Sequence, residues 1–114
     1  MGLPESEITK QIRDVLKAAG IWHYKHYSGG AYQPRRGISD IIGCYEGRFL
    51  AIEAKREGWT KPEIGTKAYK HYLEQRQFLE EVVDAGGIGF FASSPETVIK
   101  KLDLKCQLYP LFSK

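Results

Sequence analysis

Cysteine and long apolar stretches are both scarce in this 114-residue sequence, and each scarcity excludes a class of protein. The only cysteines, Cys44 and Cys106, lack the spacing of a zinc finger, so neither a disulfide scaffold nor a structural zinc site is expected. No stretch approaches the roughly 20 apolar residues that cross a bilayer, and the opening residues, MGLPESEITK, lack a basic-then-apolar secretion signal. We therefore expect no membrane partner and a single domain over residues 1–114, in a reducing cytoplasm.

Acidic residues are missing from a long segment near the N-terminus. None occurs in residues 15–39, where Lys25, Arg35 and Arg36 are interleaved with aromatic residues. A second segment, residues 55–70, holds five Lys or Arg against two Glu. Cations among aromatic residues suit a phosphate backbone and stacked bases, although an ordinary solvated surface can have the same composition. The sequence therefore indicates a nucleic-acid partner, with Lys25, Arg35 and Arg36 as candidate contacts.

The spacing of apolar residues predicts a helix, three strands, a second helix, a fourth strand and a third helix. Helical periodicity marks the first two helices, alternation or short apolar runs mark the strands, and Ser94 before Pro95 is a typical helix start. The last strand, IGFFA, is expected to be buried on both faces. The predicted bounds are 8–19, 22–27, 39–45, 48–56, 69–83 and 88–92, with loops at 28–37 and 58–67. This order predicts an α/β fold, with helices flanking a mixed central sheet of about four strands.

Charged residues occur near the start of the second predicted strand and near the end of the third, away from the turn that joins the two strands. If Glu46 and Gly47 form a two-residue hairpin turn, the register places Asp40 directly opposite Glu53, and Lys55 projects on the same face. Two facing carboxylates repel each other unless a cation lies between them. A hard divalent cation such as Mg²⁺ would remove that penalty, and the nearby ammonium could hold or activate a water molecule. This chemistry suits hydrolysis of a phosphodiester.

Two structural alternatives remain open for the same residues. Asp40 could simply begin a strand, with Glu53 and Lys55 pointing outward from an edge strand as a solvated pair. A three-residue loop in place of the two-residue turn would shift the register by one and separate the acids onto opposite faces. The candidate site therefore depends on the length of the hairpin turn.

The same residues carry a resemblance to a nuclease superfamily. Gly37-Ile-Ser-Asp40, followed after twelve residues by Glu53-Ala-Lys55, resembles the PD-(D/E)xK signature of restriction-endonuclease-like nucleases, with Ser39 where proline is often found. More narrowly, GISDIIGCYEGRFLAIEAKREG followed by EQRQFLEEVVDAGGIGFFASS is similar to the virus-type replication-repair nuclease (VRR-NUC) family. The resemblance implies a restriction-endonuclease-like core and a metal-dependent endonuclease.

The resemblance assigns roles to particular residues. It implies that Asp40 and Glu53 bind Mg²⁺ or Mn²⁺, with the backbone carbonyl of Ala54 as the third protein ligand, and that Lys55 is the catalytic lysine. Gln75 matches a glutamine that borders the active site in the family.

Other residues have weaker support. Glu7 corresponds to an acidic residue that approaches the metal centre in related nucleases, although an exposed Glu in the first helical turn is also favoured by the helix dipole. Trp59, just beyond the lysine, could be a substrate-side aromatic or a dimer contact.

The resemblance further implies the substrate and the assembly. We expect a DNA endonuclease that leaves a 5′-phosphate and a 3′-hydroxyl on branched DNA, such as a Holliday junction, during replication, repair or recombination in a bacterial cell or a phage-infected host. Stand-alone relatives resemble junction resolvases, which implies a homodimer. The alternatives are a non-catalytic nucleic-acid-binding module that keeps the nuclease fold, and a structural protein without affinity for nucleic acid.

Overall fold

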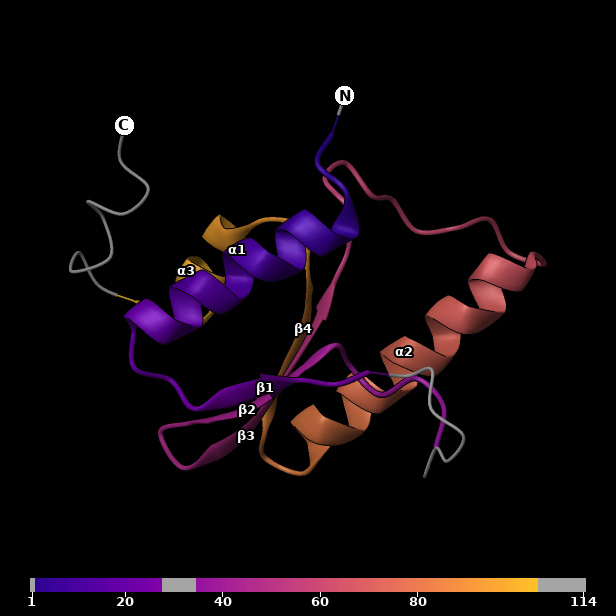
Figure 1. The fold of residues 1–114 in the computed structure, drawn as a ribbon. Helices are drawn as coiled ribbons and strands as arrows, with labels where there is room; N and C mark the ends of the chain where they lie inside the picture. Colours follow the sequence, from indigo (N-terminus) through magenta and orange to yellow (C-terminus); the bar gives the residue numbers. More distant parts are fainter. Residues whose placement is uncertain (1, 28–34, 105–114) are drawn as a thin grey trace.

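A four-stranded mixed sheet with helices on both faces forms the centre of the protein (Figure 1). The computed structural model describes residues 2–27 and 35–104. Its elements are α1 (Glu5–Ala18), β1 (His23–Lys25), β2 (Ile41–Tyr45), β3 (Arg48–Ala54), α2 (Lys67–Asp84), β4 (Ile88–Ala92) and α3 (Pro95–Lys101). The α/β fold and the mixed sheet expected from the sequence are confirmed.

The strands lie in the order β1-β2-β3-β4, antiparallel through the first three and parallel between β3 and β4. Because parallel neighbours need a crossover connection, α2 runs between β3 and β4 and packs on one face of the sheet. On the other face, α1 and α3 lie together (Figure 1) and bury Ile12, Leu50 and Ile52 in the larger apolar core. Ala51 faces the opposite way, against Phe78 of α2. Successive residues of β3 therefore point to opposite faces of the sheet, as the strand period requires.

The hairpin between β2 and β3 has the predicted two-residue turn. Glu46 and Gly47 both have positive φ, 51° and 77°, which is the backbone that joins antiparallel strands with the natural twist. Ile41 pairs with Ile52 in the resulting register. The expected register is confirmed, and the alternative of a three-residue loop is wrong.

Capping residues and a glycine explain where the three helices begin or end. The Ser94 hydroxyl accepts the Thr97 N–H at 3.3 Å and starts α3, as predicted. Thr66 caps α2 in the same way, so this helix begins at Lys67, inside the segment expected to be a loop. Gly20, with φ of 72°, follows the end of α1.

The first three strands are shorter than the sequence predicts, whereas β4 has the predicted bounds. The ladder between β1 and β2 covers three residue pairs, so Trp22 lies outside β1 and is 66% exposed. Asp40 precedes β2, and Lys55 follows β3. The expectation that β4 is buried on both faces is met in part: Phe90 and Ala92 are buried in the larger core on one face, whereas Phe91 on the other face is half-buried against the smaller cluster.

Some expectations fall outside the described residues. Most of the predicted loop at 28–37 is among them, as is Cys106. Within residues 2–27 and 35–104, no helix combines the length and the apolar character needed to span a bilayer.

Candidate active site

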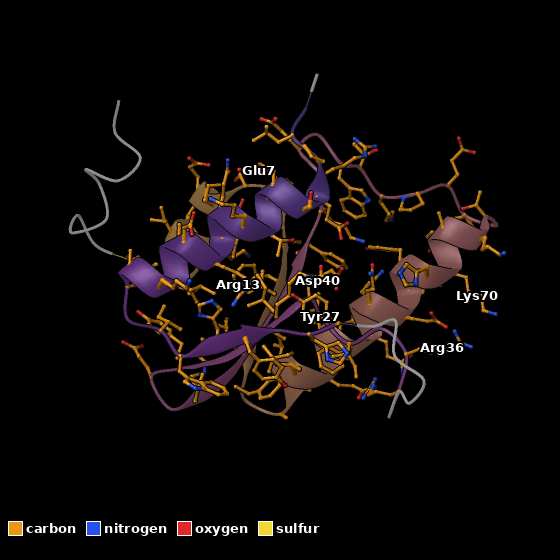
Figure 2. The ribbon with its side chains drawn as sticks, in the orientation of Figure 1. Glu7, Arg13, Tyr27, Arg36, Asp40 and Lys70 are labelled. Carbon is orange, nitrogen blue, oxygen red and sulfur yellow. The ribbon has the colours of Figure 1, made fainter. Side chains whose placement is uncertain are left out.

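Asp40 and Glu53 meet where β2 begins and β3 ends. The hairpin register, continued by one residue, places the two acids opposite each other. The Asp40 carbonyl accepts the His26 N–H at 2.7 Å, and its carboxylate Oδ2 accepts the Ala54 N–H at 3.1 Å. Asp40 is therefore held on both sides, and Figure 2 shows it between α1 and α2.

Glu53 is a buried carboxylate, with 2% of its surface exposed. Burial raises the pKa of Glu53 to about 9, and the negative charge of Asp40 adds to the rise while Lys55 opposes it. Glu53 Oε1 has no hydrogen-bond partner among the residues that the structure describes. An ionised, buried carboxylate that faces a second acid is unfavourable unless a cation binds beside it. Since Lys55 is also buried, the alternative of an outward, solvated pair is wrong.

Gln75 of α2 links the acid to the lysine. Its Oε1 accepts a hydrogen bond from Lys55 Nζ at 2.7 Å, and its Nε2 donates to Glu53 Oε2 at 2.9 Å. The lysine nitrogen lies 3.9 Å from the same Glu53 oxygen. All three side chains are buried, so the amide holds a carboxylate and an ammonium at a fixed separation. The structure thus brings Gln75 to the centre of the site.

Gly37 allows the chain before Asp40 to approach α2. Its φ is 79°, a conformation that favours glycine. A Cβ at this position would collide with the backbone of α2 at Glu74 and Gln75. This close contact brings Asp40, just before β2, near Gln75 of α2.

Glu5 of α1 interacts electrostatically with residues of the site. Partial burial raises the pKa of Glu5, and the charge of Asp40 raises it further, whereas Lys55 lowers it. Glu7 is two positions further along the helix, so it projects from a nearly opposite side, and Figure 2 shows it on α1 above Asp40. Glu5 therefore interacts electrostatically with Asp40 and Lys55, and the role expected of Glu7 stays a prediction.

The predicted nucleic-acid contacts have different surroundings. The Arg35 guanidinium is 2.6 Å from a carboxylate oxygen of Glu81, an ion pair that holds it along α2. The Lys25 ammonium lies 4.1 Å from the centre of the Tyr27 ring. Arg36 is the most open of the three, with 85% of its side chain exposed.

An aromatic cluster packs beside the lysine. Trp59 stacks on Phe91 with ring centres 5.6 Å apart, and Phe91 stacks on Tyr72 at 5.5 Å. Lys55 Nζ lies 5.3 Å from the centre of the Trp59 ring, within the range of a cation–π contact. Trp59, for which the sequence allows two roles, packs within this chain and forms one wall around the ammonium.

The residues at this site fit a divalent cation. No group of three His, Cys, Asp or Glu side chains within residues 2–27 and 35–104 forms a ready-made metal cage. Mg²⁺, however, commonly uses one or two carboxylates and completes its shell with water or phosphate. Asp40 and Glu53 supply the two carboxylates. In an extended strand, the N–H and the C=O of one residue point to the same side. Since the Ala54 N–H donates to the Asp40 carboxylate, the Ala54 carbonyl also faces the side of Asp40.

Comparison of the chain with protein-family models, with curated proteins and with solved structures gave no match. The resemblance to the VRR-NUC family therefore stays a prediction.

Proposed function

We propose that this protein is a DNA endonuclease that depends on Mg²⁺ or Mn²⁺. The observation that supports this most is the pair of facing carboxylates, Asp40 and Glu53, linked through one buried amide to Lys55. A buried acid pair has no stabilising role of its own, because like charges repel in a poorly hydrated site. A phosphodiester hydrolase needs this set: oxygen ligands for a cation, and a fixed ammonium beside the reacting phosphate.

Asp40, Glu53 and the Ala54 carbonyl would hold the metal ion. When bound, the ion lowers the pKa of a coordinated water and offsets the negative charge of the phosphate. Lys55 donates one hydrogen bond to Gln75, which leaves its other N–H groups for the attacking water and a phosphate oxygen. Gln75 orients the ammonium and one carboxylate together, so that the water meets the phosphate in a fixed geometry.

The proposed reaction is hydrolysis. The water oxygen bonds to phosphorus, the bond from phosphorus to the 3′ oxygen breaks, and the leaving 3′ oxygen takes up a proton. The products are a 5′-phosphate and a 3′-hydroxyl. We propose branched DNA, such as a four-way junction, as the substrate and a homodimer as the active form, since a symmetric junction offers two equivalent bonds. Both refinements follow from the resemblance.

Cleavage of a labelled panel of DNA forms tests this proposal. Four-way junction, flap and plain duplex are incubated with Mg²⁺ or Mn²⁺ and with wild-type, Asp40→Asn or Asp14→Asn protein. Asp14 is the matched control, because its carboxylate pairs with Lys10 on the exposed side of α1. We expect wild type and Asp14→Asn to cut, with the junction cut fastest, and Asp40→Asn to be inactive. If wild-type protein cuts no form with either ion, the nuclease function is rejected, and DNA binding without cleavage would then indicate a non-catalytic module.

A further inference from the structure

A groove of about 620 Å³ lies beside the site, along the N-terminal half of α2. It is lined by Arg36, Lys67, Ala68, Lys70, His71 and Glu74, and we call it the basic groove. We infer that the basic groove binds the sugar–phosphate backbone of the strand to be cut, on one side of the scissile bond. This inference rests on the proposed function, and it adds the path that the DNA takes to reach the site.

The basic groove is continuous with the catalytic side chains. His71 lines the groove, and its Nε2 lies 3.3 Å from Gln75 Nε2, one helical turn further along α2. Gln75 in turn contacts Lys55 and Glu53. On the loop side, Arg36 precedes Gly37, which lies close to the backbone of α2 at Glu74 and Gln75. A strand that follows the groove therefore arrives at the proposed metal ligands.

The charges in the basic groove suit phosphates. Arg36, Lys67 and Lys70 are cations, and the single acid is Glu74. Glu74, whose side chain is 26% exposed, lies 4.0 Å from Arg36 and 3.7 Å from His71. Both distances are long for an ion pair and both partner side chains are largely exposed, so these pairs are weak and a phosphate can replace Glu74 as the partner. Neither Lys67 nor Lys70 has an ion-pair partner in the described part of the chain. Figure 2 shows Arg36 and Lys70 on the same side of α2.

The direction of α2 adds to the positive potential of the basic groove. The helix begins at Lys67, so its positive dipole end lies at the groove, and the first turn contains no acidic residue. Anions are favoured at such an end. The aromatic cluster lies on the other flank of Gln75, where its rings are already stacked on one another. The basic groove is thus the polar, cationic flank of the site.

Charge reversal of two groove lysines tests the inference. Binding is measured by fluorescence anisotropy of labelled duplex and four-way junction, between about 50 and 200 mM salt, with all proteins in the Lys55→Ala background and EDTA present. Lys67→Glu/Lys70→Glu is compared with Lys100→Glu/Lys101→Glu. The control pair makes the same charge change on exposed residues of α3, which covers the opposite face of the sheet. Circular dichroism and thermal unfolding confirm that each variant is folded.

We expect the groove variant to bind roughly tenfold or more weakly at about 100 mM salt, and its log–log salt slope to fall by about 2, because each lost phosphate contact removes about 0.9. The control variant should keep both affinity and slope. Equal losses in the two variants would mean a general effect of net charge and would overturn the inference. The milder pair Lys67→Gln/Lys70→Gln replaces the groove variant if charge reversal unfolds the protein.

The binding test separates this inference from the proposed function. If the wild type cuts DNA but the groove substitutions leave affinity, salt slope and KM unchanged, the inference fails and the nuclease function stands. If DNA binding depends on the groove while wild-type protein cuts nothing, the groove stands and the nuclease function fails. Absence of binding to either DNA form at low salt overturns both.

Discussion

Replacing Glu53 by Gln is expected to remove a pH-dependent loss of stability from the metal-free protein. The pKa of Glu53 is raised by burial and by the charge of Asp40 to about 9, whereas in the unfolded chain it returns to the ordinary value of 4.5. At a pH between these two pKa values, Glu53 keeps its proton in the folded protein but has released it in the unfolded chain. The free energy of unfolding must therefore fall as the pH rises from about 4.5 to about 9. Below this range Glu53 is protonated in both states and does not make stability depend on pH.

The size of the effect follows from the same pKa. One pH unit inside the window changes the free energy of unfolding by about 1.4 kcal/mol, so the loss between about pH 5 and pH 7 is about 2 to 3 kcal/mol. This is a large share of the roughly 5–15 kcal/mol that holds a small domain folded. Gln has the shape of a protonated Glu, and its carbonyl can still accept from Gln75, so Glu53→Gln should lack this pH dependence.

Urea denaturation at several pH values in EDTA measures this difference. Glu80→Gln is the matched control, since its side chain is exposed and pairs with Arg76 on the surface of α2. Millimolar Mg²⁺ or Mn²⁺ should restore much of the lost stability to the wild type at high pH and leave Glu53→Gln unchanged, because only the ionised acid gains from the ion. Wild-type stability that matches Glu53→Gln at every pH, with no response to metal, would refute the account of a strained carboxylate pair.

Two further substitutions probe the contacts that hold the site. Gln75→Leu leaves the Lys55 ammonium and Glu53 Oε2 without their partner, so urea denaturation should show a loss of about 2 kcal/mol or more, and nicking should fall. Gly37→Ala introduces a Cβ that overlaps the backbone of α2, and we expect a loss of more than about 1 kcal/mol. Gly20→Ala is its control, because φ is also positive there but the space is open. Equal losses for the two alanines would argue against the close approach.

The acid pair is predictable from the sequence once the length of the hairpin turn is known. Gly47 can adopt the positive φ of a two-residue turn, and with that turn the period of the strands fixes which residues face each other. The sequence leaves a three-residue loop open, and the structure shows the two-residue turn that pairs Asp40 with Glu53. The strand ends are less predictable from the sequence. The length of β1, for example, is set by the three residue pairs that it forms with β2, and this pairing depends on the tertiary structure.

Glu5 and Gln75 show where the sequence is less informative. Two acids, Glu5 and Glu7, lie in the first turn of α1. Glu5 lies three residues before Ile8, in line with the apolar stripe, but its side chain is exposed, so the sequence pattern does not single it out. Gln75 lies on the same face of α2 as Phe78, which marks it as an inward polar residue. Its hydrogen bonds to Glu53 and Lys55, however, arise only from packing between helix and sheet.

The central claim is that Lys55 and the facing acids cut DNA with the help of a metal ion. The most direct measurement compares the Mg²⁺-dependent nicking rate of wild type, Lys55→Ala and Lys100→Ala, with DNA affinity measured on the same preparations. The account predicts that Lys55→Ala loses about a hundredfold or more in rate while its affinity is retained, and that Lys100→Ala equals the wild type. Nicking by Lys55→Ala at the wild-type rate, or no nicking by wild-type protein with either ion, would contradict it.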